Sequence, residues 1–124
     1  MKALVVDDSA IARKIMVGAL SKAGITNVEQ VEDGERALAA VMGGNFDLVL
    51  MDWHMPNMSG IDALHEIRAR GKQVPIIMVT VEADKARVAE ALRAGADDYL
   101  IKPVPPDLFV KRILTVLARA SERD

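Results

Sequence analysis

Cysteine is absent from the 124-residue sequence, and aromatic residues are scarce. Without cysteine the chain can form no disulfide, no thiolate zinc site and no cysteine nucleophile. Aromatic residues make up only 3% of the chain, whereas 51% of it is hydrophobic, so the core must be built from Val, Ile, Leu, Met and Ala. A chain of this length buries roughly two-thirds of its unfolded surface, which is enough for a cooperative fold without covalent cross-links.

A strong excess of charge is missing as well. The sequence has 16 Lys and Arg against 18 Asp and Glu, a formal net charge of -2, so charge gives no reason to expect binding to nucleic acid or to an anionic membrane. No apolar run approaches the roughly 18 residues of a membrane span, and Asp7 and Asp8 follow the first apolar run too closely for a signal peptide. We therefore expect a cytoplasmic protein without membrane insertion or direct nucleic-acid binding, folded as one domain over residues 1–124 and present as a monomer or weak dimer.

Five short apolar runs punctuate the chain, and each is bounded by acidic residues, Pro or Gly. Runs of this length fit strands that are buried on both faces, as in a parallel sheet. Glu29 and Gln30 interrupt the second run, which places that strand at or near an edge of the sheet. The predicted strands are Ala3–Val6, Val28–Val31, Leu48–Met51, Ile76–Val79 and Tyr99–Ile101.

The stretches between these runs have helical periodicity. A glycine follows each of the first four predicted helices, the fifth begins near Pro106, and the polar tail from Ala120 to Asp124 is expected to fray. The strict alternation predicts an α/β fold of five βα units, a doubly wound parallel five-stranded sheet with helices on both faces. The apolar stripes of the five helices are Ile11, Ile15, Ala19 and Leu20; Ala37, Leu38 and Val41; Ile61, Leu64 and Ile67; Val88, Ala91 and Leu92; and Leu108, Phe109, Ile113, Val116 and Leu117.

Polar side chains follow the first, third, fourth and fifth predicted strands. Binding sites in open parallel sheets form outside the carboxyl ends of the strands, where the winding direction reverses. If the strand order is 2-1-3-4-5, a common one for such sheets, the first and third strands are neighbours and their acids converge. The residues at these strand ends are Asp7 and Asp8, then Asp52, then Thr80, and then Lys102 with Pro103.

Three converging carboxylates repel one another unless a cation neutralises them. An oxygen-only set of ligands suits a hard ion, Mg²⁺ or alternatively Mn²⁺. Such an ion beside Lys102 would leave Asp52 free to attack phosphorus, and this chemistry predicts an acyl phosphate on Asp52. The metal ion and Lys102 would offset the charge of the transferring group, while Thr80 could donate to its oxygens.

Four separated motifs together resemble the receiver domain of bacterial response regulators. They span essentially the whole chain in the order of that family, and within it they are most similar to single-domain chemotaxis regulators. The resemblance implies a flavodoxin-like fold with strand order 2-1-3-4-5, and a phosphoprotein of a two-component regulatory system. The motifs are Val5-Val6-Asp7-Asp8, Met51-Asp52-Trp53-His54-Met55-Pro56-Asn57-Met58-Ser59-Gly60, Pro75-Ile76-Ile77-Met78-Val79-Thr80, and Gly95-Ala96-Asp97-Asp98-Tyr99-Leu100-Ile101-Lys102-Pro103.

The resemblance implies a role for each residue of the predicted site. Asp52 is the expected phosphoacceptor, taking its phosphoryl group from a phosphohistidine of a sensor histidine kinase. Asp7, Asp8 and Asp52 are expected to bind Mg²⁺, with the backbone carbonyl of His54 as a further ligand. Lys102 is expected to contact the phosphoryl oxygens and to precede a cis peptide bond to Pro103.

The resemblance also implies a switch made of Thr80 and Tyr99. The hydroxyl of Thr80 moves towards the phosphoryl group, and the ring of Tyr99 turns inward into the space that the hydroxyl leaves. The change is expected to reach a face formed by the fourth helix, the fifth strand and the fifth helix, where a downstream effector protein binds. In this interpretation the chain is not an enzyme, because it catalyses only its own phosphorylation and dephosphorylation.

The sequence departs from the usual pattern of this family after Lys102-Pro103. Val104 stands where the family usually has Phe, and Pro105 and Pro106 follow it. His54 and Glu82 lie two residues beyond Asp52 and Thr80, at positions that help to set the lifetime of the phosphorylated state in this family.

Other functions stay open at this point. The chain could be a phosphorelay intermediate or the isolated receiver of a larger regulator. An aspartyl phosphatase is less favoured, because such sites usually carry Asp-x-Asp whereas Asp7 and Asp8 are adjacent. A flavodoxin-like cofactor binder is also disfavoured, because Asp7 and Asp8 would repel the phosphate of a flavin. Asp8 and Ser9 are good helix caps as well, which is a purely structural role for that pair.

Overall fold

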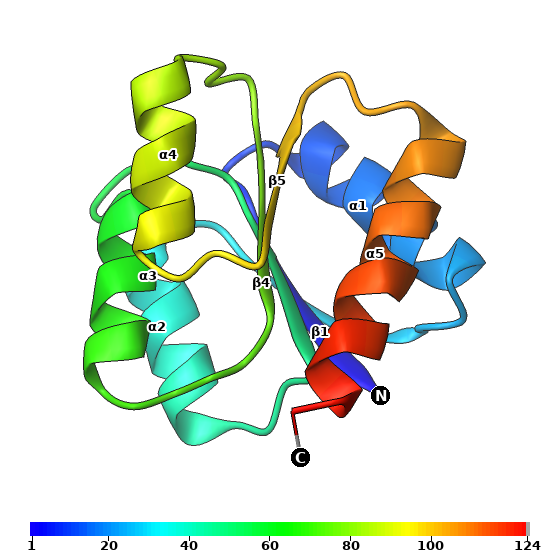
Figure 1. Ribbon diagram of the computed structural model, residues 1–124, viewed down its shortest axis with the longest axis horizontal. Coiled ribbons are helices and arrows are strands. Elements are labelled where there is room, and N and C mark those ends of the chain that lie inside the picture. The colour runs from blue at the N-terminus through cyan, green and yellow to red at the C-terminus, as the bar shows by residue number, and fades with distance from the viewer. Residues whose placement is uncertain (124) are drawn as a thin grey trace.

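The computed structural model describes residues 1–123, in which five strands and five helices alternate (Figure 1). In chain order these elements are β1 (Lys2–Val6), α1 (Ala10–Lys22), β2 (Asn27–Val31), α2 (Gly34–Gly43), β3 (Leu48–Met51), α3 (Gly60–Ala69), β4 (Ile76–Thr80), α4 (Lys85–Arg93), β5 (Asp98–Ile101) and α5 (Pro106–Ser121).

All five strands pair in parallel, in the order β2-β1-β3-β4-β5. Helices α1 and α5 cover one face of this sheet, and α2, α3 and α4 cover the other (Figure 1). The predicted fold class and strand order are therefore confirmed, and the polar β2 is an edge strand as its sequence indicates. The order makes β1 and β3 neighbours, with Val6 opposite Met51, so that the residues following both strands meet at one edge of the sheet.

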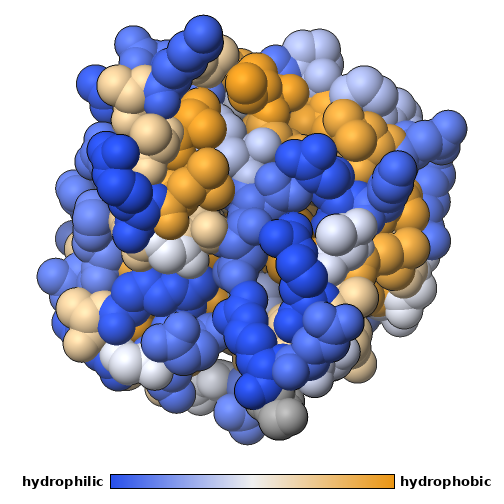
Figure 2. Space-filling view, viewed as in Figure 1, coloured by the Kyte–Doolittle hydropathy of each residue, from blue (hydrophilic) through white to orange (hydrophobic). Residues whose placement is uncertain are grey.

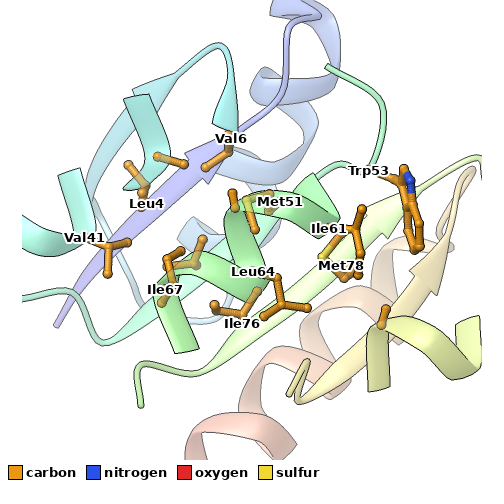
Figure 3. Close-up of a cluster of buried hydrophobic side chains, with 14 of the residues drawn as sticks. Leu4, Val6, Val41, Met51, Trp53, Ile61, Leu64, Ile67, Ile76 and Met78 are labelled. Carbon is orange, nitrogen blue, oxygen red and sulfur yellow. The ribbon is translucent and has the colours of Figure 1, made fainter. Parts of the chain in front are cut away.

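Side chains alternate along the central strands between two hydrophobic clusters. Leu4 and Val6 of β1 pack beneath α2 and α3 (Figure 3), whereas Ala3 and Val5 pack beneath α1 and α5. Because both faces of the inner strands are covered, β1, β3 and β4 are apolar at nearly every position, which explains their continuous apolar runs.

The predicted apolar stripe of α1 is wrong in its first half. Ile11 and Ile15 are 76% and 60% exposed, whereas Met16, Ala19 and Leu20 are buried. Residues 12, 16 and 20 form a stripe one position later than residues 11, 15 and 19, and both have helical spacing, so periodicity alone does not choose between them. Leu92 and Leu108 also belong to predicted apolar stripes, but their side chains are 47% and 38% exposed.

Polar caps and glycines set the helix ends. Ser9 accepts a hydrogen bond from the Ala12 amide and so caps α1, which leaves the side chain of Asp8 without a capping role. Gly24, Gly71 and Gly95 take left-handed conformations just past α1, α3 and α4. The prediction of a fraying tail is wrong for its first residues, since α5 continues to Ser121, and Asp124 lies outside the described residues.

No helix within residues 1–123 has the length and apolar character needed to cross a membrane.

Candidate functional site

Three carboxylates meet where β1 and β3 end. Asp7, Asp8 and Asp52 each offer an oxygen, and these atoms all lie within 4.8 Å of one another. The Asp52 amide donates to the Val6 carbonyl at 3.0 Å, which extends the pairing of the two strands into the site. Asp7 and Asp52 are buried, with 1% and 8% exposed, while Asp8 is open to solvent. The structure thus places the three predicted carboxylate ligands together.

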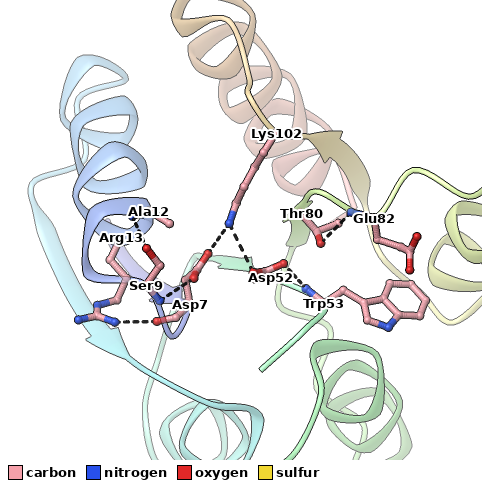
Figure 4. A network of polar contacts seen from close by, with 9 residues as sticks. All are labelled: Asp7, Ser9, Ala12, Arg13, Asp52, Trp53, Thr80, Glu82 and Lys102. Carbon is pink, nitrogen blue, oxygen red and sulfur yellow. Dashed lines mark hydrogen bonds and ion pairs between the residues drawn. The ribbon is translucent and has the colours of Figure 1, made fainter. Parts of the chain in front are cut away.

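Lys102 reaches this cluster from the end of β5 (Figure 4). Its Nζ lies 2.6 Å from Asp7 Oδ2 and 3.4 Å from Asp52 Oδ2. Its amide donates to the Thr80 carbonyl at 2.9 Å, and its peptide bond to Pro103 is cis. One ammonium against three carboxylates leaves a formal charge of two negatives at the site, which favours binding of a divalent cation.

The two oxygens of the Asp52 carboxylate have different surroundings. Oδ1 accepts a hydrogen bond from the Trp53 amide at 2.7 Å, which fixes the rotation of the carboxylate. Oδ2 faces the ammonium of Lys102. Because Oδ1 has a backbone partner, Oδ2 is the oxygen better placed to form a new bond.

Asp7 is fixed by the start of α1. Its Oδ1 accepts from the Ser9 amide at 2.9 Å, and its backbone carbonyl accepts from Arg13 Nη1 at 2.7 Å (Figure 4). The carboxylate is therefore oriented before any cation binds, which reduces the cost of ordering a metal ligand.

The donor set fits a hard cation. All three side chains present carboxylate oxygens, the ligands that Mg²⁺ and Mn²⁺ prefer. The His54 imidazole turns away, with Nε2 3.2 Å from Glu82 Oε1, so it is not a fourth side-chain ligand. The cluster of Asp7, Asp8 and Asp52 could hold a metal ion.

Thr80 and Tyr99 meet at a shared partner, Glu82. Thr80 is fully buried at the end of β4, and its Oγ1 accepts from the Glu82 amide at 3.2 Å. The Tyr99 hydroxyl donates to the Glu82 carbonyl at 2.7 Å, and its ring is only 8% exposed. The ring is thus already inward in this structure, and the loop at Glu82 links the two residues of the predicted switch.

Sequence reasoning missed one residue at the rim of the site. Arg87 of α4 approaches the Glu82 carboxylate to 3.5 Å and lies over the Trp53 ring, 5.5 Å from its centroid. The family pattern indicates a role for Glu82, but nothing in the sequence indicates its contact with His54. No spacing in the sequence indicates that Arg87 packs on Trp53, because that contact depends on how α4 lies against the loop after β3.

The surroundings of Tyr99 lead to a prediction about its titration. Burial, and then the charges of Glu82 and Asp52, raise the pKa of Tyr99 to about 12. The fold favours the protonated phenol, so the stabilisation is present below a pKa near 10 and is lost as the pH rises towards about 12. At about pH 11 we expect roughly a tenth of the phenol to be ionised, against roughly nine-tenths for an exposed tyrosine.

Tyr99 is the single tyrosine of the sequence, so the ultraviolet absorbance of tyrosinate reports on it alone. Circular dichroism at each pH identifies the range in which the protein stays folded, and the urea-unfolded chain supplies the reference titration. A midpoint near 10 in protein that is still folded would contradict this prediction.

Comparisons with known proteins agree with this geometry. The family model of the response regulator receiver domain matches residues 3–114. Among curated proteins, the chain is 39% identical to the chemotaxis protein CheY of Pseudomonas aeruginosa over 123 residues, covering 98% of this chain and 99% of that protein. It is 40% identical to the chemotaxis protein CheY1 of Helicobacter pylori, covering 94% of this chain and 97% of that protein.

Solved structures give the same result. A CheY-like response regulator receiver domain protein from Methanospirillum hungatei JF-1 matches with a TM-score of 0.91 and 28% identity, covering 99% of this chain and 98% of the other. The chemotaxis response regulator CheY4 of Vibrio cholerae matches with a TM-score of 0.83 and 33% identity, covering 93% and 97%. The chain therefore belongs to the response regulator receiver domain family, in which it is CheY-like.

Proposed function

We propose that the protein is the phosphoacceptor of a two-component system. Asp52 takes a phosphoryl group from a phosphohistidine of a sensor histidine kinase in a reaction that depends on Mg²⁺, and a downstream effector protein binds the altered surface. The observation that carries the proposal is the place of Asp52 Oδ2, which faces the Lys102 ammonium inside a cluster of three carboxylates.

The proposed reaction is a transfer between two nucleophiles. Asp52 Oδ2 attacks phosphorus, the phosphorus–nitrogen bond to the donor imidazole breaks, and the leaving imidazole takes up a proton from solvent. The product is an acyl phosphate on Asp52 and a neutral histidine on the donor. The chain acts only on itself in this scheme, so it is not an enzyme with a separate substrate.

Residues already in place supply most of the required electrostatics. Lys102 Nζ is held by Asp7 and Asp52, so its charge is positioned before the phosphoryl group arrives. Asp7, Asp8, Asp52 and the backbone carbonyl of His54 would hold Mg²⁺, which when bound supplies positive charge to the phosphoryl oxygens. Thr80 lies at the end of the neighbouring β4, and its hydroxyl proton is available for donation while its oxygen accepts from Glu82.

The same contacts suggest how phosphorylation changes the surface. A hydrogen bond from Thr80 to a phosphoryl oxygen is charge-assisted and worth on the order of 1.5 to 3 kcal/mol. Movement of Thr80 towards that oxygen weakens its bond to the Glu82 amide, and the Glu82 carbonyl holds the Tyr99 hydroxyl. The change therefore reaches α4 and β5, with an equilibrium shift of roughly 100-fold for a gain of about 3 kcal/mol.

The face formed by α4, β5 and α5 suits a protein partner. Leu92 of α4 and Ile101 of β5 are large aliphatic side chains that are each 47% exposed. Figure 2, in the orientation of Figure 1, shows apolar residues gathered beside α4 and on the α1–α5 side among polar neighbours. Gathered apolar side chains with a polar rim mark protein interaction sites.

A direct test uses acetyl phosphate as the donor. With Mg²⁺ present we expect a mass increase of one phosphoryl group per chain, located at residue 52 and removed by hydroxylamine, which cleaves acyl phosphates. A chelator added before the donor is expected to prevent the labelling. Absence of label with Mg²⁺ present, or a label that resists hydroxylamine, would overturn the proposed function.

A further inference from the structure

We propose that Asp33 is a positioning residue for the metal site and acts through Asn57. The contact between them holds the β3–α3 loop, residues 52–59, and with it the orientation of the His54 peptide. The inference rests on the proposed Mg²⁺-dependent function, because the His54 carbonyl is a metal ligand only within that function.

Asp33 is a buried acid that the predicted site does not use. It is 4% exposed at the start of α2 and lies outside the cluster of Asp7, Asp8 and Asp52. Its Oδ1 accepts from the Arg36 amide at 2.8 Å and caps the helix. Its Oδ2 accepts from Asn57 Nδ2, also at 2.8 Å. A cap requires only one carboxylate oxygen, so the second oxygen, which also lies 3.9 Å from Arg36 Nε, can serve the contact with the loop.

The surroundings keep the Asp33 carboxylate charged. The hydrogen bond from the Arg36 amide lowers its pKa, burial acts in the opposite direction, and the hydrogen bond from Asn57 lowers the pKa further. A charged acceptor makes the contact with Asn57 stronger than a contact between neutral groups.

The backbone of the loop shows that Asn57 is held in an unusual conformation. Asn57 has φ = 67°, the only positive φ of a non-glycine residue within residues 1–123. Left-handed conformations carry a cost in most residues and persist where surrounding contacts fix them. Next to Asn57, the Met58 carbonyl accepts from the Gly34 amide at 3.0 Å, and a Cβ on Gly34 would come within 2.5 Å of that oxygen.

A second attachment holds the other end of the loop. The Gly60 amide, at the start of α3, donates to the Trp53 carbonyl at 2.7 Å. His54, Met55 and Pro56 therefore lie between an attachment to α3 at Trp53 and an attachment to α2 at Asn57 and Met58. Loss of the Asn57 contact would leave the α2 attachment to the hydrogen bond between Met58 and Gly34 and would hold the peptide of His54 less firmly on that side.

The test exchanges the two side chains. Asn57→Asp places a second carboxylate against Asp33, and the two repel. Asp33→Asn combined with Asn57→Asp restores an amide–carboxylate contact with its direction reversed. Asparagine can still cap α2, aspartate tolerates the left-handed conformation, and the net charge equals that of the wild type. Loss of a residue that orients a metal ligand typically weakens metal affinity by about 10- to 100-fold.

We expect Asn57→Asp to weaken Mg²⁺ binding about 10-fold and the double variant to recover most of that loss. Titration calorimetry and the fluorescence of Trp53, the single tryptophan, measure the affinity. The rate of labelling by acetyl phosphate at saturating Mg²⁺ should change far less than the Mg²⁺ concentration needed for half the maximal rate. A general loss of stability would not separate these two quantities.

The expected weakening of Mg²⁺ binding in Asn57→Asp cannot come from the added charge alone. Asn57→Asp adds a negative charge near the site, which by itself would tighten cation binding. Glu35→Gln changes an exposed acid in the first turn of the same helix and is the matched control, with no change in affinity expected. If Asn57→Asp does not fold, Asn57→Gly removes the amide while keeping the backbone conformation accessible, and it should weaken binding similarly.

Wild-type affinity in Asn57→Asp, or a double variant no better than that single variant, would overturn the role of Asp33. Failure of the wild type itself to bind Mg²⁺ would overturn the proposed function first, and with it any ligand for Asp33 to position. The two failures are therefore distinguishable from the wild-type titration alone.

Discussion

Asp52→Asn is expected to abolish phosphoryl labelling by acetyl phosphate, with a loss of at least about 100-fold at any Mg²⁺ concentration. The amide of asparagine is neutral and has no oxygen able to form a stable acyl phosphate. The substitution nearly preserves shape, because an asparagine oxygen can still accept the hydrogen bond that Asp52 Oδ1 receives from the Trp53 amide. The expected loss is therefore one of chemistry rather than of fold.

Metal binding should weaken in the same variant, because one of three carboxylates is removed from the cluster. The amide nitrogen would instead face the Lys102 ammonium, which lies 3.4 Å from Asp52 Oδ2 in the wild type. Removal of one of three mutually repelling carboxylates offsets part of the lost ion pair, so we expect a change in unfolding free energy within about 1 kcal/mol.

Asp62→Asn is the matched control, because Asp62 is an exposed acid in the first turn of α3. Mass spectrometry of the intact chain should show full labelling of this control and none of Asp52→Asn, with circular dichroism confirming that both are folded. Full labelling of Asp52→Asn would contradict the assignment of the acceptor, and a hydroxylamine-sensitive label on Asp7 or Asp8 would relocate it.

The parts of the fold that follow from buried strands could be predicted from the sequence. Runs such as Leu48–Met51 are apolar at every position because both faces of the sheet are covered. Their extent can therefore be read without deciding which residues face which side. The site follows from the same property, since Asp7 and Asp52 come directly after such runs and parallel strands bring their ends together.

Two kinds of feature could not be predicted: which side of a helix is buried, and which residues of separate segments contact each other. The stripes through Ile15 and through Met16 in α1 differ by one residue, and only packing against α5 selects the second. Asp33 and Asn57 are 24 positions apart, and the contact of Arg87 with Trp53 joins a helix to a loop. Sequence spacing contains no measure of such distances, which is why these contacts became visible only in three dimensions.

Gly60 lies directly against the backbone of the acceptor residue, so a side chain added at this position should strongly destabilise the fold. A Cβ on Gly60 would lie 1.9 Å from the carbonyl oxygen of Asp52 and 2.9 Å from its carbonyl carbon. The Gly60 amide also donates to the Trp53 carbonyl, and Ser59 caps α3 at this point. Relief of the clash thus requires the start of α3 to move away from the end of β3.

Gly60→Ala is therefore expected to lower the free energy of unfolding by at least about 3 kcal/mol, the upper end of overpacking costs, because the clashing atoms are backbone and cannot change rotamer. Gly18→Ala is the matched control. A Cβ there meets nothing within 4 Å in the exposed middle of α1, so alanine should stabilise the helix by about 0.5 to 1 kcal/mol. Urea unfolding followed by circular dichroism measures both changes.

Equal midpoints for Gly60→Ala and the wild type would mean that α3 shifts freely relative to Asp52, which is incompatible with the attachment of the loop at Trp53. Folded Gly60→Ala protein at low temperature should still be labelled more slowly than the wild type, because the displaced Asp52 carbonyl belongs to the residue that attacks phosphorus.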